Sequence, residues 1–303
     1  MPAHCPNCNR KSVFLFKTKD LNRRISGETF TYRRCPDCGL IFQSQIPDNI
    51  SDYYQQAYYR IPSPGRLRRV AKAQKYQMDL IHKFVASGHL LEIGPAVGYF
   101  AYQAKQAGFE VDTVEQDARC CEYLTTVVGV NAIRSDSPHT IIDTMDSHDV
   151  ITMWHVIEHL PDPWACLNSA TKNLVPGGVL LIATPNPAAF QFRVLGSFWP
   201  HVDAPRHLCL FPKDLLVQRL ERLDMELVMI VSKDRGITYL NRFGWQRFLT
   251  NLFPPMLQSV IGLFFGYMGG YLISLTMKIR ESREMCGSAY TIIFRKKVPG
   301  TFN

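Results

Sequence analysis

Charged residues are scarce in this chain, and neither an internal repeat nor a secretory leader is visible. Asp, Glu, Lys and Arg make up 20% of 303 residues and hydrophobic residues 46%, a balance that excludes a disordered chain. Met1 to Cys5 contain no positively charged segment leading into an apolar run, so we expect no signal peptide and a cytoplasmic location. The length predicts one large globular domain with a small one attached.

Acidic residues are especially sparse in the first third of the chain. Residues 1–90 hold 15 Lys and Arg but 6 Asp and Glu, whereas residues 91–303 hold 19 and 20. The formal net charge of +8 therefore comes from the N-terminal third. Such a surplus suits nucleic acid, an anionic membrane face or a phosphorylated substrate, and composition alone does not choose among them.

Cysteine, in contrast, is abundant, and four of the nine cysteines form two Cys-x-x-Cys pairs. Cys5 and Cys8 make the first pair, and Cys35 and Cys38 make the second. Because disulfides are rare in the cytoplasm, this spacing predicts a structural zinc ribbon in which four thiolates close a tetrahedral site. A segment of about 40 residues buries too little apolar surface to fold without its metal. A redox role is the alternative, and the ribbon would bind nucleic acid, bind protein or brace a neighbouring domain.

Residues 46–85 connect the ribbon to the rest of the chain. Prolines and tyrosines between residues 46 and 65 predict a linker with one short helix. From Arg66 to Val85, apolar residues recur at helical spacing among basic ones, which predicts a basic amphipathic helix. We expect its apolar stripe to pack on the core, although a membrane or RNA surface would also suit it.

Short apolar segments alternate with helical ones from His89 onward. This alternation predicts βαβ units on a mostly parallel sheet, that is, a doubly wound α/β fold. The strand-like segments are Leu90–Ile93, Glu110–Val114, Val150–Met153, Val179–Ala183, Leu227–Val231 and Tyr290–Phe294.

The first of these strands runs into a glycine-spaced turn, Gly94 to Gly98, and a helix is expected to follow. Glycine allows a sharp turn and a close approach to a ligand, and the helix N-terminus presents free N–H groups. The next strand ends at Glu115, 21 residues after Gly94, where a carboxylate would accept hydrogen bonds from both ribose hydroxyls of a nucleoside. Nicotinamide dehydrogenases share this geometry, so the turn alone leaves the cofactor open.

Five blocks in this order resemble the class I S-adenosylmethionine-dependent methyltransferases over residues 85–235 and 286–296. The blocks are Glu92 to Gly98, Val114-Glu115, His148 to Ile151, His155 to Pro163 and Leu174 to Leu180. The resemblance implies a seven-stranded, Rossmann-like sheet, S-adenosylmethionine as cofactor and methyl transfer as the reaction. A sheet of this kind that has lost its cofactor is the alternative.

The resemblance also implies which residues bind the cofactor. Glu115 would hold the ribose, Glu92 would orient the turn, and Asp136 would lie beside the adenine amine. The family usually has glycine where this chain has Ala96, and the added methyl group is expected to be accommodated with a negative φ. The implied cofactor-binding residues are Glu92, Gly94, Ala96, Gly98, Glu115 and Asp136.

The segment from His201 to Phe211, together with a zinc ribbon ahead of the core, resembles a bacterial branch of this family. Methyltransferases of surface-polysaccharide, lipid-linked and secondary-metabolite pathways belong to that branch. Because their acceptors are diverse, the resemblance implies a small-molecule, glycan or lipid-linked acceptor without naming it.

Three histidines are candidate catalytic residues. Methyl transfer to a hydroxyl is assisted by a general base, and histidine is the side chain best suited to that role near neutral pH. His155 and His159 follow the fourth strand of the expected sheet, and His207 follows the fifth. The alternatives are a cofactor wall for His155, helix capping or a divalent ion for Glu158 with His159, and a loop brace for His207.

Large aromatic residues near these histidines are candidates for the acceptor pocket. Trp154, Trp199 and Phe211 would form an aromatic wall, unless they belong to the core. Arg206 would pair either with an acidic group of the acceptor or with Asp203.

A run of thirty residues without a charge, 248–277, precedes the last strand. Its length alone would suit a transmembrane helix. A single crossing would separate two strands that should pair, so we expect a helical hairpin broken near Pro254-Pro255 and around Gly266 or Gly269-Gly270. The hairpin would dip into the inner face of the membrane, shape a pocket for a lipid-linked acceptor, or form a buried lid or dimer interface. A stripe of small residues would allow close helix contact, namely Gly262, Gly266, Gly270 and Ser274.

The sequence therefore predicts a methyltransferase that acts on oxygen with a histidine base. An RNA methyltransferase is the alternative, since the ribbon and the basic region could hold phosphates, and a non-enzymatic zinc-ribbon scaffold is the second. Nothing in the sequence specifies an oligomeric state. The expected parts are a zinc ribbon (1–45), a linker with the amphipathic helix (46–85), the cofactor-binding core (86–235), the apolar helical insertion (236–285) and the last core strand with a tail (286–303).

Overall fold

The structure is a computed structural model that describes residues 4–54, 58–254 and 262–300. Two compact units alternate along the chain. The N-terminal segment therefore shares a unit with segments that are distant from it in the sequence. The first unit combines residues 1–53, 184–216 and 231–290, and the second unit combines residues 54–183, 217–230 and 291–303.

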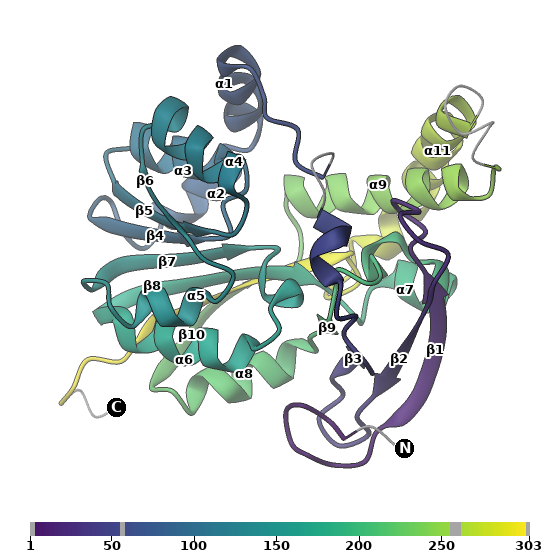
Figure 1. The fold of residues 1–303 in the computed structure, drawn as a ribbon, viewed down its shortest axis with the longest axis horizontal. Helices are drawn as coiled ribbons and strands as arrows, with labels where there is room; N and C mark the ends of the chain where they lie inside the picture. The colour runs from purple at the N-terminus through teal and green to yellow at the C-terminus, as the bar shows by residue number, and fades with distance from the viewer. Residues whose placement is uncertain (1–3, 55–57, 255–261, 301–303) are drawn as a thin grey trace. The chain divides into compact units, whose positions relative to one another are not determined.

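The second unit is built around a seven-stranded sheet with strand order β10-β11-β8-β7-β4-β5-β6 (Figure 1). β4 pairs in parallel with β5 and β7, β5 with β6, and β7 with β8. The central strands are almost fully buried, as expected for apolar strands covered on both faces. This arrangement confirms the predicted Rossmann-like sheet. The strands are β4 (His89–Ile93), β5 (Glu110–Glu115), β6 (Asn131–Arg134), β7 (His148–Trp154), β8 (Leu174–Pro185), β10 (Met225–Val231) and β11 (Ala289–Lys296).

Helices cover both faces of this sheet (Figure 1). α2, α3 and α4 lie on one face, and α5, α6 and α8 lie on the other. The helices are α1 (Pro64–Ala73), α2 (Tyr76–Ile81), α3 (Tyr99–Gln106), α4 (Ala118–Tyr123), α5 (Pro138–Ile142), α6 (Pro163–Asn173) and α8 (Lys213–Glu221), with a π-helix η2 (Leu124–Val128) and a 3-10 helix η3 (Ile157–His159).

The amphipathic segment 66–85 differs from its prediction, because two helices replace one. α1 ends at Ala73 and α2 begins at Tyr76. Both short helices pack on α3, and each buries its own apolar residues there, which one straight helix over the same stretch would not achieve. Strand β6 was not predicted, because Asn131–Arg134 contains no apolar run.

The first unit contains a four-stranded antiparallel sheet with order β1-β2-β3-β9. Its core includes Phe30, Tyr32, Trp199 and Leu210, so the N-terminal hairpin and the segment after β8 share one apolar interior. The elements are β1 (Val13–Lys19), β2 (Thr29–Arg34), β3 (Ile41–Gln43), β9 (Cys209–Leu210), α7 (Phe190–Leu195) and the 3-10 helices η1 (Ile50–Tyr54), η4 (Gly196–Phe198) and η5 (Pro200–Val202).

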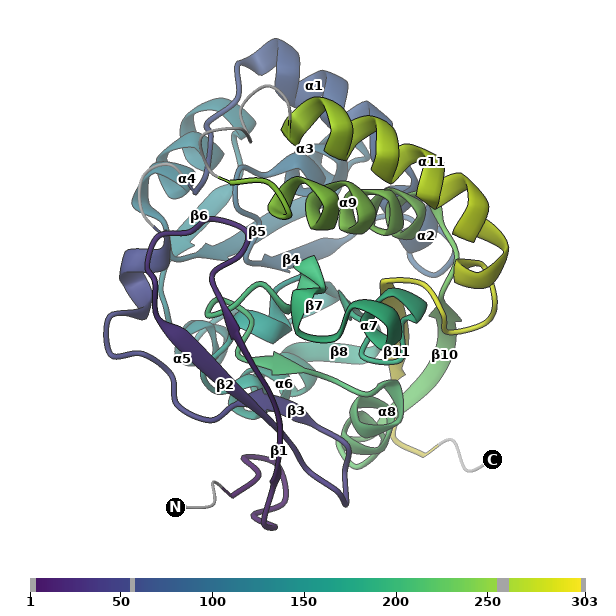
Figure 2. The ribbon, with the colours of Figure 1, turned by 90° about the vertical axis from the view of Figure 1, so that its right-hand side faces the viewer.

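The apolar insertion forms two helices, α9 (Arg235–Asn251) and α11 (Leu263–Glu281), which pack side by side (Figure 2). The contact uses the predicted stripe of small residues. A Cβ placed on Gly270 would lie 2.5 Å from the backbone of Gln246, and one on Gly266 would overlap the Thr250 hydroxyl. The break predicted around Gly266 or Gly269-Gly270 is wrong, because α11 continues through these glycines, which pack against α9. Of the break predicted near Pro254-Pro255, Pro255 lies outside the described residues. None of the helices that the structure describes is both long and apolar enough to cross a membrane.

Candidate active site

The turn between β4 and α3 contains three residues in the left-handed region of backbone conformation. φ is +66° at Gly94, +50° at Ala96 and +74° at Gly98. The expectation of a negative φ at Ala96 is therefore wrong. The Ala96 N–H donates a 2.9 Å hydrogen bond to Glu115 Oε2, which holds the turn in this conformation. Left-handed backbone costs an alanine about 1–2 kcal/mol, so strain is present beside a predicted cofactor site.

Strand register brings the neighbours of this turn to the same edge of the sheet. Ile93 pairs with Val114 of β5 on one side and with Met153 of β7 on the other. The residues that follow each of them, Glu115 and Trp154, therefore flank the turn. β4 lies between β5, which follows it in the chain, and β7, which comes later. The strands after β4 are therefore added first on one side of it and then on the other. Doubly wound sheets bind ligands at such a switch point.

Glu115 is buried and held by backbone donors. Its Oε1 accepts hydrogen bonds from the N–H groups of Gln116 (2.8 Å) and Asp117 (2.9 Å), and its Oε2 accepts one from Ala96. Burial raises the pKa of this carboxyl above its usual range, while the three N–H groups act in the opposite direction by stabilising the ionised form.

Glu92 lies in β4 and is also buried. Burial raises its pKa to about 8, opposed by a backbone hydrogen bond from Ala101 at the start of α3. Within the described residues, Glu92 Oε2 and Trp154 Nε1 have no hydrogen-bond partner. Buried polar atoms without partners are uncommon and point to a ligand or water at this edge.

Asp136, the expected adenine partner, lies on the exposed loop after β6. Its carboxylate accepts a 3.0 Å hydrogen bond from the Ser137 hydroxyl. The neighbouring Ser135 N–H donates to the Glu115 carbonyl at 3.0 Å, so this loop begins directly beside the end of β5.

Two tyrosines of the predicted linker lie near this edge, which the prediction of a linker did not include. Tyr59 is half-buried, and burial and then the nearby Glu115 carboxylate raise the pKa of its phenol. The Tyr54 hydroxyl lies 2.9 Å from His159 Nδ1. The concentration of tyrosines among prolines between residues 46 and 65 is the sequence signal from which this position could have been predicted.

His155 directly follows β7 and has a φ of +58°, which is unusual for a residue with a side chain. Its N–H donates to the Ala183 carbonyl at 2.9 Å. Its side chain is 38% exposed, and Nδ1 lies 3.5 Å from Oε1 of the fully buried Glu158. A partly exposed imidazole is therefore placed at the carboxyl edge of the sheet with a carboxylate beside it.

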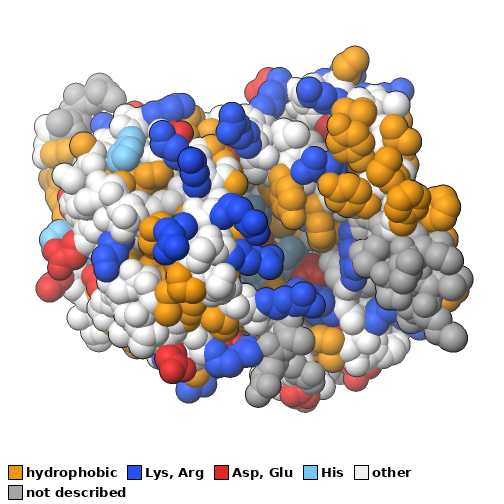
Figure 3. All heavy atoms as spheres, turned by 90° about the horizontal axis from the view of Figure 1, so that it is seen from above, with side chains coloured by type: hydrophobic (Ala, Val, Ile, Leu, Met, Phe, Trp, Pro, Cys, Tyr) orange, Lys and Arg blue, Asp and Glu red, His pale blue; other side chains and the backbone are white. Residues whose placement is uncertain are grey.

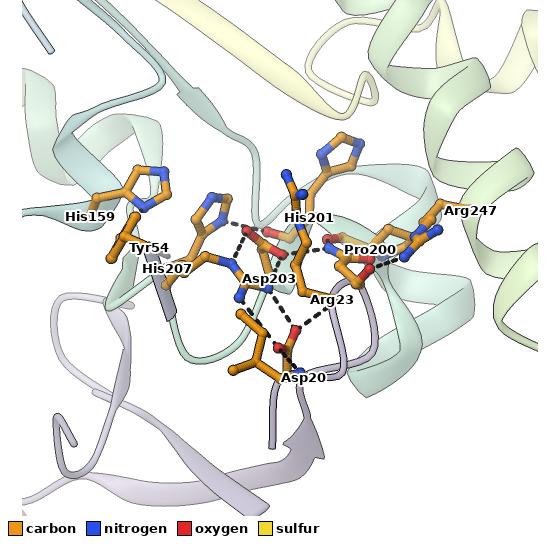
Figure 4. Close-up of polar contacts among 12 residues, drawn as sticks. Asp20, Arg23, Tyr54, His159, Pro200, His201, Asp203, His207 and Arg247 are labelled. Atoms are coloured by element: carbon orange, nitrogen blue, oxygen red, sulfur yellow. Dashed lines mark hydrogen bonds and ion pairs between the residues drawn. The ribbon is translucent and has the colours of Figure 1, made fainter. Parts of the chain in front are cut away.

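His207 and Arg206 belong to the first unit. His207 Nδ1 lies 2.8 Å from the His201 carbonyl oxygen. Arg206 is fully buried and contacts Asp203 (2.8 Å) and Asp20 (2.7 Å). It therefore pairs with Asp203, which was the second of the two predicted alternatives. Figure 4 shows Asp20 and Asp203 with their carboxylates close together. Trp199 and Phe211 are buried at 1% and 0% exposure, which makes them core residues rather than a wall open to an acceptor.

The four cysteines of the predicted ribbon lie together in the first unit. Their sulfurs all lie within 4.8 Å of one another, with Cys5 to Cys38 at 3.6 Å and Cys8 to Cys35 at 3.5 Å. Zn–S bonds of about 2.3 Å in a tetrahedron place sulfurs about 3.8 Å apart, so the cluster has the size that zinc requires.

Comparison with protein families agrees with this geometry. A methyltransferase-domain family model matches residues 66–230, which is more than half of the chain. The match begins in α1 and ends in β10, so it includes the glycine turn, Glu115 and His155.

Similar curated proteins include two that are named ubiquinone biosynthesis O-methyltransferase. The one from Nitrosospira multiformis is 22% identical over 172 residues, which are 52% of this chain and 69% of that protein. The one from Saccharophagus degradans is 28% identical over 120 residues, which are 37% of this chain and 51% of that protein. The match thus spans about half to two thirds of these relatives.

Solved structures share the fold. A SAM-dependent methyltransferase from Archaeoglobus fulgidus aligns with a TM-score of 0.50 and 18% identity over 76% of this chain and 94% of that one. A cyclopropane synthase from Mycobacterium tuberculosis aligns with a TM-score of 0.51 and 14% identity over 74% and 84%. Together with the family match and the glycine turn beside a buried acid, they show that the chain belongs to the class I S-adenosylmethionine-dependent methyltransferases.

Proposed function

We propose that the enzyme transfers the methyl group to a hydroxyl oxygen of a small-molecule acceptor, with a histidine as general base. The name O-methyltransferase of the two relatives supports oxygen as the methylated atom. The observation that carries the proposal is His155, which stands in a strained conformation at the carboxyl end of β7. Strained polar residues at such an edge commonly have a functional role.

The carboxyl ends of β4 and β5 suit S-adenosylmethionine. A carboxylate offers about four acceptor positions. Three of those on Glu115 are taken by backbone N–H groups, so the ribose can still donate a hydrogen bond to it. We assign Glu92 to orienting the turn through α3, and Asp136 to the adenine amine. The turn residues assigned to the methionine and ribose side are Gly94, Ala96 and Gly98.

His155 acts on the acceptor. When bound, S-adenosylmethionine supplies a methyl group on a positively charged sulfur. His155 takes the proton of the acceptor hydroxyl as its oxygen attacks, and the buried Glu158 carboxylate stabilises the imidazolium that forms. Tyr59 limits the access of water to the ribose end.

His207, in the first unit, and His159, in the second unit, are the two other candidate histidines. The His201 carbonyl can only accept, so the neutral His207 ring carries its hydrogen on Nδ1 and its basic lone pair on Nε2. His159 is oriented by the Tyr54 hydroxyl. We propose that His159 positions the acceptor while His155 moves the proton, and that His207 is a second candidate for the base.

The acceptor class is tested by incubating the enzyme with labelled S-adenosylmethionine and a cell extract. We expect label in the small-molecule fraction, and less of it with the Glu115→Gln variant when S-adenosylmethionine is below saturation. Label in RNA would reject the small-molecule proposal in favour of an RNA methyltransferase, and label in a glycan or lipid fraction would redefine the acceptor.

The base is tested with His155→Asn on the labelled fraction. Asparagine tolerates the left-handed conformation, so the fold should be kept. We expect kcat to fall by about 10²–10⁴-fold with cofactor affinity unchanged. His139→Asn, on α5 of the same unit, is the matched control and should leave kcat unchanged. A small effect at His155 with a large one for His207→Asn would move the role of base to His207.

We also propose that Cys5, Cys8, Cys35 and Cys38 bind one structural zinc ion. The thiolate donor set and the spacing of the sulfurs support zinc. Metal analysis of the purified protein should find one zinc per chain, and Cys35→Ser with Cys38→Ser should remove it. Strong chelation should lower the melting temperature, and an equal melting temperature with and without zinc would contradict a structural role.

A further inference from the structure

Helix α11 exposes large apolar side chains to solvent. Ile279 is 76% exposed and Phe264 63% exposed, and several neighbours are exposed by more than half. Figure 3 shows hydrophobic side chains gathered over the α9 and α11 pair. The members of this exposed face are Phe264, Phe265, Tyr267, Leu272, Leu275 and Ile279. A contiguous apolar face of this kind on a folded protein marks an interaction surface.

The exposed face follows from the way the two helices pack. Exposed apolar residues recur at spacings of three, four and seven and occupy one side of α11. The opposite side carries Gly266 and Gly270, which contact α9. An ordinary surface helix buries its large apolar residues and exposes polar ones. α11 has the opposite arrangement, because its large apolar side chains face solvent and its glycines face α9.

A cationic cavity adjoins this face. A cavity of about 630 Å³ between α9 and α11 is lined by Lys233, Arg235, Arg242 and Lys278, and also by Tyr271 and Leu275 of α11. In the part of the chain that the structure describes, none of the four cations forms an ion pair.

The two acidic residues that line the cavity are engaged elsewhere. Asp234 caps the N-terminus of α9 by accepting from Ile237 N–H at 2.7 Å. Glu281 is buried and accepts from Trp245 Nε1 at 2.7 Å and from Gln191 Nε2 at 2.8 Å. The cavity therefore offers a surplus of positive charge to an anion, directly beside an apolar surface.

We propose that the α9–α11 hairpin docks on a bilayer that contains anionic lipid. α11 lies in the membrane plane with its exposed face among the acyl chains, and the four cations contact phosphate headgroups. A symmetric contact with a second copy would bring the same four cations together from both chains, which opposes that occupant.

Vesicle sedimentation with the full chain tests the apolar part. We expect the protein to sediment with phosphatidylcholine vesicles that contain phosphatidylglycerol, and less with phosphatidylcholine alone. Leu272→Glu with Leu275→Glu should lower the bound fraction at least about tenfold, since each leucine loses its apolar burial and gains a charge. Val194→Glu, an equally exposed apolar position on α7, is the matched control and should bind as the wild type does.

The cationic part has its own variant. Lys233→Glu with Lys278→Glu should reduce binding to the anionic vesicles selectively, and Lys17→Glu, on β1 of the same unit, should not. High salt should weaken wild-type binding in the same direction. Cofactor affinity, measured for every variant, should stay unchanged and shows that each is folded.

Three results would overturn the proposal. The wild type stays in the supernatant with both kinds of vesicle, or the α11 variants sediment as the wild type does. Alternatively, the wild type elutes as a dimer that the α11 variants convert to a monomer, without vesicle binding, and the face then belongs to a second copy. None of these results bears on the proposed O-methylation, which is measured separately.

Discussion

The carboxyl edge of the second unit's sheet and the Arg206 region of the first unit both bury carboxylates, but they compensate the charge differently. Glu92 and Glu115 receive backbone N–H groups, and neither forms an ion pair within the described residues. Asp20 and Asp203 share the guanidinium of Arg206. In the ion triad, the charges of the two carboxylates are compensated by Arg206. At the sheet edge, Glu115 can still accept a hydrogen bond, and Glu92 Oε2 and Trp154 Nε1 are buried without a partner among the described residues. Incomplete compensation of this kind is what we expect of a ligand site, and complete compensation is what we expect of a structural contact.

The largest expected effect comes from breaking the ion triad of Arg206, Asp20 and Asp203. Arg206→Met leaves Asp20 and Asp203 buried without their cation and should lower the free energy of unfolding by about 3–5 kcal/mol. Urea denaturation measures this change. Arg68→Met, at an exposed position of α1, removes the same group and should change stability by less than about 0.5 kcal/mol. Equal effects at both positions would mean that the triad contributes nothing beyond a surface arginine.

The second-largest effect is expected at the carboxyl edge of the sheet, where a substitution should change the affinity for S-adenosylmethionine. Glu115→Gln replaces one acceptor oxygen with an NH₂ group that cannot accept from backbone N–H. A hydrogen bond to a charged group contributes about 1.5–3 kcal/mol, so the dissociation constant for S-adenosylmethionine should rise by roughly 10- to 100-fold. Calorimetry measures it. Asp136→Asn, on the exposed loop, should have a smaller effect, and the reverse order would contradict the assignment of the ribose to Glu115.

The local parts of the fold and site followed from the sequence. Short apolar or alternating segments predicted β4, β5, β7 and β8, and the glycine turn and the acid at the end of the next strand were predicted to lie together, as the hydrogen bond from Ala96 to Glu115 shows. These patterns are readable because each lies within a few residues of one element. The small-residue stripe likewise predicted which side of α11 contacts α9.

Features that depend on distant contacts did not follow. Asp20 and Arg206 are 186 residues apart, and no pattern in either segment announces their pairing. Tyr59 belongs to a stretch whose composition indicates a linker, yet folding places it, half-buried, near Glu115. The positive φ at Ala96 depends on a hydrogen bond to a residue of the next strand. A sequence window contains none of this information.

The two regions should also respond to pH in opposite directions. Burial raises the pKa of Glu92 from 4.5 to about 8, so its folded form holds the proton more tightly, and stability falls as pH rises through that window. Burial acts the same way on Asp203, but Arg206 outweighs it and lowers the pKa of Asp203. The stability that the triad contributes is therefore lost as pH falls.

Glu92→Gln tests the first half of this contrast. The wild type should lose stability between pH of about 5 and 8, and this loss should be smaller in the variant by at least about 1 kcal/mol. Melting curves across that pH range measure the difference. Glu122→Gln, an exposed acid in the same unit, should leave the pH dependence unchanged. If the stability of Glu92→Gln depends on pH as strongly as that of the wild type, Glu92 is ionised in the folded protein.

The smallest expected effect concerns the strain at Ala96. Ala96→Gly relieves a left-handed conformation that costs alanine about 1–2 kcal/mol and gives back part of this through the freer unfolded chain, so the free energy of unfolding should rise by about 0.5–1 kcal/mol. Ala101→Gly, within α3, should instead destabilise by at least about 1 kcal/mol, because glycine there adds backbone freedom and removes a buried methyl group. If both substitutions destabilise equally, the turn is not strained. The turn would then adopt this conformation by itself, without being held by the hydrogen bond from Ala96 to Glu115.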